Sequence, residues 1–297
     1  IMDKRNVIDL RIAKLPFRLD ASESRIKLNT PPSHAKFLKN NPDKQEYFSY
    51  DQRKLHLQIN NNLLKRQNLN ISPIQCVEIW ELWKDEAGNF IFVAPRQSPP
   101  QYISVDPVFT EGNVYSEYPS NNQQGIYPIF NDLEIVFFVN WLGTFGDILL
   151  HASGVILDGK GYAFIGTSGA GKSTLASTLA EEPAVTVLGE DQVILRLIDG
   201  QFCIYGTPWH LNPAMCSPQE VPLEKLFFLE KNGEYAAEPI KPSDGITRIL
   251  QTAFIPYYRP ELVAKILDHL ITLAVKIPFR SLSYPLGSDV WKLINPD

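Results

Sequence analysis

The chain has 297 residues, 44% hydrophobic residues and a net charge of −5, an ordinary globular composition with room for one large or two modest domains. This small negative charge gives no general attraction to nucleic acid or to an anionic membrane, so neither is expected as a partner. The three cysteines lack C-x-x-C spacing, no apolar run reaches about 18 residues, and no N-terminal secretory signal is recognisable. We therefore expect a cytoplasmic protein without a zinc site or a disulfide framework.

The first 128 residues follow the two-residue period of β-strands. The strands expected on this ground are 7–19, 55–59, 76–83 and 90–93, the last two joined by a hairpin turn at 85–89. Polar connections, among them 120–125, separate the strands, and no amphipathic helical pattern appears between them. Residues 1–128 are predicted to form a β-rich domain that could serve substrate recognition.

From residue 129 onward, the pattern changes to an alternation of helices and strands. A helix at 133–142 is apolar on nearly all sides, as a helix buried between layers would be. The strands expected after it are 148–157, 162–165, 185–188, 193–197, 202–205 and 226–229, and the helices 246–254 and 261–275 follow a polar loop at 232–245. Residues 129–297 are predicted to form an α/β domain.

Residues 166–174 read GTSGAGKST and match the phosphate-binding pattern G-x-x-x-x-G-K-[ST] at every fixed position. The expected strand precedes the match, and apolar residues at helical spacing follow it up to Pro183. Glycines let successive N–H groups point inward, and the start of a helix adds its positive dipole. Lys172 would reach the β- and γ-phosphates of ATP, and the Ser173 hydroxyl would ligate Mg²⁺. The predicted nucleotide-binding residues are Gly166, Thr167, Ser168, Gly169, Ala170, Gly171, Lys172, Ser173 and Thr174.

Glu190 and Asp191 directly follow the strand expected at 185–188. In open α/β sheets, ligands gather at the carboxyl ends of strands, so both carboxylates are expected near the phosphates. A hard cation prefers charged oxygen, which makes Glu190 a candidate to support Mg²⁺, directly or through its waters. The alternative for any Glu-Asp pair is an acidic surface turn.

Residues 151–159 read HASGVILDG, and the phosphate-binding loop and Leu188-Gly189-Glu190-Asp191 follow them. This order and spacing resemble the catalytic core of HPr kinase/phosphorylase over about residues 149–206. The resemblance implies an α/β P-loop kinase domain with an HPr kinase C-terminal or PEP carboxykinase-like core on a mixed sheet, here preceded by the β-rich domain. It further implies catalytic roles for three residues: Lys172 as phosphate clamp, Asp191 as the base that accepts the hydroxyl proton, and His151 near the transferred phosphoryl group. A packed histidine at a strand end is the alternative for His151.

The chain departs from that family at defined positions. Thr174 stands where the family has a glutamate, and residues 203–206 read CIYG where the family has E-I-R-G with an acidic metal ligand. The N-terminal half shows no motif of the family. The chain looks more like the broad group of HPr-kinase-related proteins, some of which phosphorylate serine on small peptides, and HPr itself is not the expected partner.

These observations predict an enzyme, an ATP- and Mg²⁺-dependent phosphotransferase acting on a hydroxyl, most simply a serine of a small protein or peptide. Two alternatives stay open: a nucleotide-binding switch or scaffold with slow ATP hydrolysis, and a kinase for a small-molecule hydroxyl such as free serine. The sequence leaves the acceptor, a reverse phosphorylase reaction and a homo-oligomeric state undecided.

Overall fold

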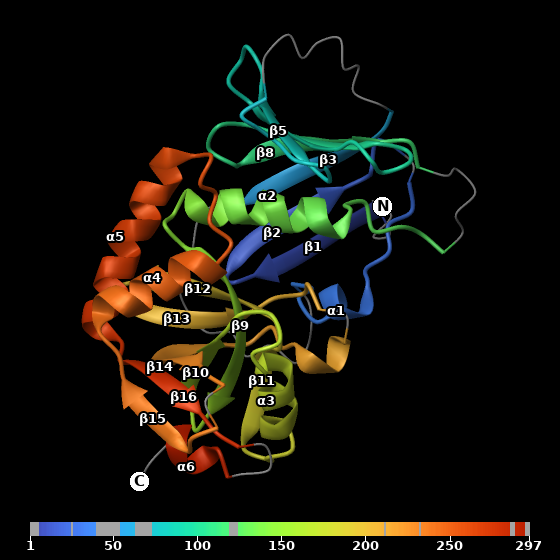
Figure 1. Cartoon of the computed structure of the whole chain (residues 1–297). Coiled ribbons are helices and arrows are strands. Elements are labelled where there is room, and N and C mark those ends of the chain that lie inside the picture. The colour runs from blue at the N-terminus through green and yellow to red at the C-terminus, as the bar shows by residue number, and fades with distance from the viewer. Residues whose placement is uncertain are drawn as a thin grey trace. The chain divides into compact units, whose positions relative to one another are not determined.

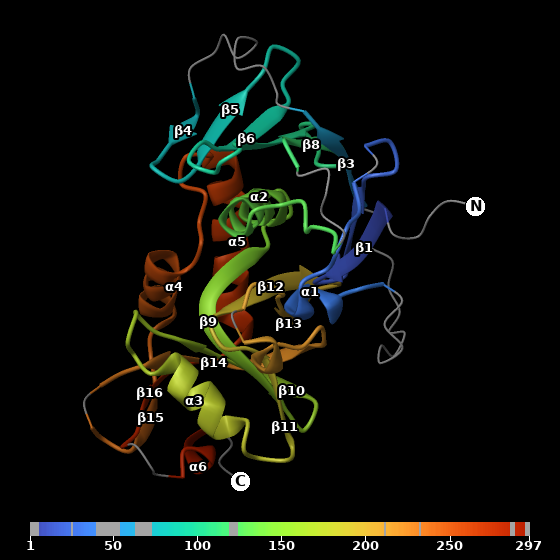
Figure 2. The same cartoon turned by 90° about the vertical axis from the view of Figure 1, so that its right-hand side faces the viewer.

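The computed structural model describes residues 6–24, 26–39, 54–62, 73–118, 124–210, 212–231, 233–285 and 289–294. The chain divides into two compact units, Ile1–Trp141 and Leu142–Asp297 (Figures 1 and 2). Each unit contains one eight-stranded sheet with parallel and antiparallel pairs, so the fold is mixed α/β with two mixed sheets. The described residues include no helix that is both long and apolar enough to cross a membrane.

The sheet of the first unit has the strand order β1-β2-β3-β8-β7-β6-β5-β4. Its strands are β1 (Val7–Ile12), β2 (Leu15–Asp20), β3 (Leu55–Asn61), β4 (Gln75–Cys76), β5 (Glu81–Lys84), β6 (Phe90–Ala94), β7 (Gln101–Val105) and β8 (Glu111–Ser116), and its helices are α1 (Pro32–Ala35) and α2 (Asn131–Gly143). The single strand predicted at 7–19 is a hairpin instead, because Ala13 and Lys14 take positive φ angles of 50° and 64° and reverse the chain. The strand predicted at 76–83 is likewise interrupted, since the Val77 N–H bonds the Trp80 carbonyl in a turn. Most of the polar connection at 120–125 lies outside the described residues.

Helix α2 packs against the sheet of the first unit through aromatic side chains. The Phe17 and Phe138 rings are 5.2 Å apart, and the Phe92 and Phe137 rings are 5.4 Å apart, both edge to face. The sequence shows that this helix is apolar on nearly all sides, but not which sheet it covers. The division into units therefore falls after Trp141, one helix later than the boundary predicted between residues 128 and 129.

The second unit contains β9 (Ile148–Leu157), β10 (Lys160–Ile165), β11 (Val185–Gly189), β12 (Gln192–Ile198), β13 (Gln201–Gly206), β14 (Glu220–Leu229), β15 (Ala236–Pro239) and β16 (Phe279–Ser283). Its helices are α3 (Lys172–Leu179), α4 (Pro242–Thr252), α5 (Pro260–Lys276) and α6 (Trp291–Ile294), with a short 3₁₀ helix η3 at Pro213–Met215. The polar loop predicted at 232–245 is wrong in part, because it contains β15 and the first turn of α4. Pro242 occupies the start of α4, where its missing N–H is not needed.

Five strands of this unit pair in a closed circuit, β9-β10-β14-β13-β12 and back to β9. Where β10 meets β14, side chains of β13 and β14 fill the space beside Gly161. A Cβ atom on Gly161 would lie 2.6 Å from Val221 Cγ1 and 2.7 Å from Ile204 Cγ2, so only glycine fits there. The circuit depends on β9, whose first half pairs with β12 and whose second half pairs with β10 on one edge and β11 on the other.

Helix α3 covers one face of β9 and β10, and α4 and α5 pack on the other (Figure 2). Leu175 and Leu179 of α3 share an apolar cluster with Val155 of β9. Side chains of a strand alternate between its faces, so His151 and Ser153 lie in the same row of β9 as Val155. Two polar residues thus continue the row that runs beneath α3.

Candidate active site

The glycine-rich loop of residues 166–171 joins β10 to α3, giving the strand, loop and helix order that the sequence predicted. Gly169 and Gly171 have φ angles of +75° and +103°, and a Cβ atom on either would meet nothing within 4 Å. These two glycines are needed for backbone conformation alone. Gly166 is needed for packing, since its Cβ would lie 2.7 Å from that of Ala170.

The first turn of α3 leaves its N–H groups available to a ligand. Gly171 is the N-cap of α3, and no side chain within the described residues caps this end. The first N–H groups of a helix have no partner within the helix, and with the dipole they favour an anion. The exposed residues of the motif are Thr167, Ser168, Gly169, Ser173 and Thr174, whereas Gly166 and Lys172 are buried and Ala170 and Gly171 are half-buried.

The Lys172 ammonium lies within the loop. Its Nζ atom donates hydrogen bonds to the carbonyls of Gly166, at 2.8 Å, and Thr167, at 3.3 Å. Burial lowers the pKa of Lys172, and the negative charge of Asp191 acts in the opposite direction. The charges of Lys172 and Asp191 are therefore close enough to influence one another.

His151 is the third member of this cluster. Its Nδ1 atom lies 3.3 Å from Asp191 Oδ1, and its ring meets that of Phe254 edge to face. Burial lowers the pKa of His151, Asp191 raises it, and Lys172 lowers it further. The structure thus brings together the three residues predicted to be catalytic, whereas Ser173 lies on the exposed first turn of α3.

Glu190 and Asp191 form the turn between β11 and β12. Burial raises the pKa of Glu190, and the neighbouring charge of Asp191 raises it further. No group of three or more potential metal ligands occurs among the described residues. Mg²⁺ usually takes only one or two carboxylates beside phosphate oxygens and water, so a Mg²⁺ site beside bound phosphates does not require a larger cluster.

Sequence reasoning gave no role to two buried hydroxyl groups beside this turn. Ser153 Oγ donates to the Glu190 carbonyl at 2.6 Å, and Thr207 Oγ1 donates to the Gln192 carbonyl at 3.0 Å. The position of Ser153 two residues after His151 was the available signal, because it places both on one face of β9. For Thr207, the sequence indicates only a rigid turn at 206–210.

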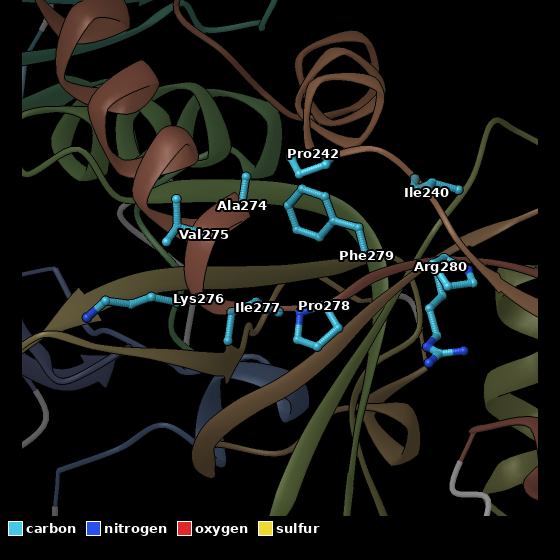
Figure 3. Close-up of a pocket in the computed structure, with 10 residues that line it drawn as sticks. Ile240, Pro242, Ala274, Val275, Lys276, Ile277, Pro278, Phe279 and Arg280 are labelled. Atoms are coloured by element: carbon cyan, nitrogen blue, oxygen red, sulfur yellow. The ribbon is translucent and has the colours of Figure 1, made fainter.

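A hollow of about 290 Å³ in the same unit lies apart from these residues (Figure 3). It is lined by the end of α5, the start of β16 and the segment between β15 and α4, and it includes none of the predicted site residues. Its lining is mainly apolar, with Phe279 in the middle and Arg280 beside it.

Taken together, the loop, the buried lysine and the acidic turn define a candidate nucleotide-binding site on a mixed α/β unit. No protein-family model matches the chain, and no curated protein matches it in sequence. Among solved structures, the chain is similar to the HPr(Ser) kinase/phosphatase from Coxiella burnetii, with 15% identity and a TM-score of 0.27 over 49% of this chain and 85% of that chain. No residue role follows from a similarity of this size.

Proposed function

We propose that this protein is an ATP- and Mg²⁺-dependent kinase that transfers the γ-phosphoryl group to a hydroxyl, most simply a serine of a small protein or peptide. Its main support is the convergence of Lys172 and Asp191 at a glycine-rich loop that opens a helix. Phosphoryl transfer needs a cation at the phosphates and an acceptor for the hydroxyl proton, and these two residues supply both.

In this mechanism, the free N–H groups at the start of α3 hold the phosphates of ATP. Lys172 exchanges its hydrogen bonds to Gly166 and Thr167 for bonds to phosphate oxygens. When bound, Mg²⁺ would neutralise part of the phosphate charge, and Ser173 and Glu190 are the residues that would hold it.

Asp191 then accepts the proton of the acceptor hydroxyl, while the hydroxyl oxygen forms a bond to the γ-phosphorus and the bond from that phosphorus to ADP breaks. His151 lies at hydrogen-bonding range of Asp191, so its ring can orient the carboxylate. Burial lowers the pKa of His151 and so favours the neutral ring, in which one of the two ring nitrogens carries a proton to donate.

A different class of function also has support. The Asp191 side chain is 45% exposed, so water can reach it as well as a peptide hydroxyl can. One alternative is therefore a nucleotide-binding switch that hydrolyses ATP slowly. A second alternative is a kinase whose acceptor is free serine.

The decisive experiment measures ADP formation from MgATP with no acceptor, with free serine and with a panel of serine-containing peptides. A kinase responds to at least one acceptor, and Asp191→Asn abolishes that stimulation while MgATP binding persists. A slow rate that no acceptor changes would favour the switch, and a chain that fails to bind MgATP would refute the proposed site.

A further inference from the structure

The turn that carries Asp191 is held from two sides by hydroxyl groups of other elements. Residues 190 and 191 lie between β11, which ends at Gly189, and β12, which begins at Gln192. Ser153 of β9 donates to the carbonyl before Asp191, and Thr207 donates to the carbonyl of the residue after it. Both hydroxyl-bearing residues are 0% exposed, so water does not compete for these bonds.

The Thr207 hydroxyl also contacts a histidine ring. His210 Nε2 lies 3.0 Å from Thr207 Oγ1. The threonine hydroxyl has a single proton, and a carbonyl can only accept, so that proton goes to Gln192 and the His210 N–H must donate to the threonine oxygen. The His210 ring also occupies the space beside Gly189, where a Cβ atom would lie 2.8 Å from Nε2.

Pairing with β13 stops just short of this turn, whereas pairing with β9 continues on both sides of it, at Gly189 opposite Gly154 and at Gln192 opposite His151. The last β12–β13 pair joins Val193 to Gly206, so Thr207 stands where the next pair would come and its side chain bonds the Gln192 carbonyl. On the other side, the register of β11 against β9 shifts between Val187 and Gly189. The two hydroxyl groups therefore add side-chain hydrogen bonds at Glu190, between the paired residues, and at Gln192, on the edge where pairing with β13 has ended.

We propose that Ser153 and Thr207 are positioning residues that hold the backbone on both sides of Asp191 and thereby set the place of its carboxylate beside His151. As a contribution to catalysis, this rests on the proposed role of Asp191 as base. A base must come within about 3 Å of the proton that it takes, and a displacement of about 1 Å lowers turnover by about 100-fold. Releasing one of the two bonds leaves the other in place, so we expect a loss of about tenfold.

A test that does not depend on the acceptor uses the His151 ring as a reporter. The chain has five histidines, and His151→Gln assigns the His151 resonance in the NMR spectrum. Asp191 raises the pKa of His151, so Asp191→Asn lowers that pKa and gives the reference for complete loss of the carboxylate. Lys172 is the other charge that acts on this ring, and every variant in the comparison retains it.

Two variants remove one hydroxyl each, and two serve as controls. Thr207→Val and Ser153→Ala lose the hydrogen bond, whereas Thr207→Ser keeps a hydroxyl. Thr272→Val removes a hydroxyl that donates to the Asp268 carbonyl at 2.9 Å within α5. We expect the first two to shift the pKa of His151 toward its value in Asp191→Asn, and the controls to titrate as the wild type does.

Turnover is measured on the same variants as ADP formation from MgATP with the best available acceptor. We expect kcat to fall by about tenfold in Thr207→Val and Ser153→Ala, with the KM for MgATP unchanged because the glycine-rich loop keeps its own hydrogen bonds.

A His151 titration identical to wild type in both variants would overturn the proposal, whatever happens to kcat. Should Ser153→Ala fail to fold, Thr207→Val against Thr207→Ser decides the matter alone. If Asp191→Asn keeps full turnover, the role of Asp191 as base is wrong, while the His151 comparison still tests the positioning.

Discussion

Replacing Lys172 by methionine separates the function of this residue from its part in the fold. The substitution keeps an unbranched, apolar stem of four heavy atoms and removes the ammonium group. Loss of one preorganised charge-stabilising donor lowers turnover by about 10²- to 10³-fold, equivalent to about 2.7–4 kcal/mol of transition-state stabilisation. We expect Lys172→Met to show a loss of this size in kcat and weaker binding of MgATP.

Stability should respond very differently. Lys172 Nζ makes two hydrogen bonds to loop carbonyls, but burial lowers its pKa, so the fold disfavours the charged form. These contributions oppose each other, and the free energy of unfolding should change by less than about 1 kcal/mol, or about 2–4 °C in melting temperature. Between the lowered pKa of Lys172 in the folded protein and its ordinary pKa in the unfolded chain, the unfolded chain binds more protons than the folded protein does. The free energy of unfolding of the wild type therefore rises with pH across this range. Lys172→Met should lack that rise.

Lys160→Met is the matched control. Lys160 lies in the same unit, at the start of β10, and its ammonium group forms an exposed ion pair with Glu224 at 3.2 Å. The substitution therefore removes the same charge from an exposed position. Exposed pairs contribute little, about 0–1 kcal/mol, so this variant should keep its stability, its affinity for a fluorescent ATP analogue and its rate of ADP formation.

Full turnover and full ATP affinity in Lys172→Met would refute the assignment of the loop as a phosphate site. A large loss of stability would refute the balance between burial and hydrogen bonding described above. Equal losses in Lys160→Met and Lys172→Met would point to a general effect of charge.

Other substitutions test the remaining assignments. Asp191→Asn keeps the shape of the side chain but cannot accept a proton, so turnover should fall by about 10²- to 10⁴-fold while equilibrium binding of MgATP persists. Glu190→Gln should raise the Mg²⁺ concentration needed for half-maximal rate. The Glu190 carboxyl must lose its proton to attract Mg²⁺, and its pKa is raised. The Mg²⁺ affinity of the wild type should therefore increase with pH over a range higher than that in which a glutamate usually titrates. Glu190→Gln should not show this increase. Arg196 donates a hydrogen bond to the buried Asp147 carboxylate at 2.6 Å, and Arg196→Met removes the charge of this pair's arginine. The free energy of unfolding, measured by urea titration, should fall by about 3–5 kcal/mol. An effect below about 1 kcal/mol would contradict this expectation.

Local patterns in the sequence predicted the parts of the fold that depend on local physics. The strand predicted at 148–157 has the same bounds in the structure, and the helix predicted at 261–275 runs from Pro260 to Lys276. The glycine-rich loop follows from its spacing, since positive φ at Gly169 and Gly171 is a property of the residues themselves.

Pairings between distant segments could not be read in the same way. Nothing in the local sequence joins Ser153 to Glu190, because this bond depends on how separate strands come to lie together. The bond from Thr207 to Gln192 lies at the open end of the β12–β13 hairpin, and predicting it requires the exact register of that hairpin. The short edge strand β15 also escaped prediction, since half of its four residues are exposed and it lacks an alternation of buried and exposed positions.

The double pairing of β9 has a consequence for the way the site forms and fails. The strand that leads into the loop binds one edge of β9, the two strands that flank the acidic turn bind the other, and β9 itself carries His151. None of these groups can reach its place before β9 is paired on both edges. Amide hydrogens of β9 should therefore exchange with solvent only through global opening of this unit, so partial unfolding would not leave a half-assembled site.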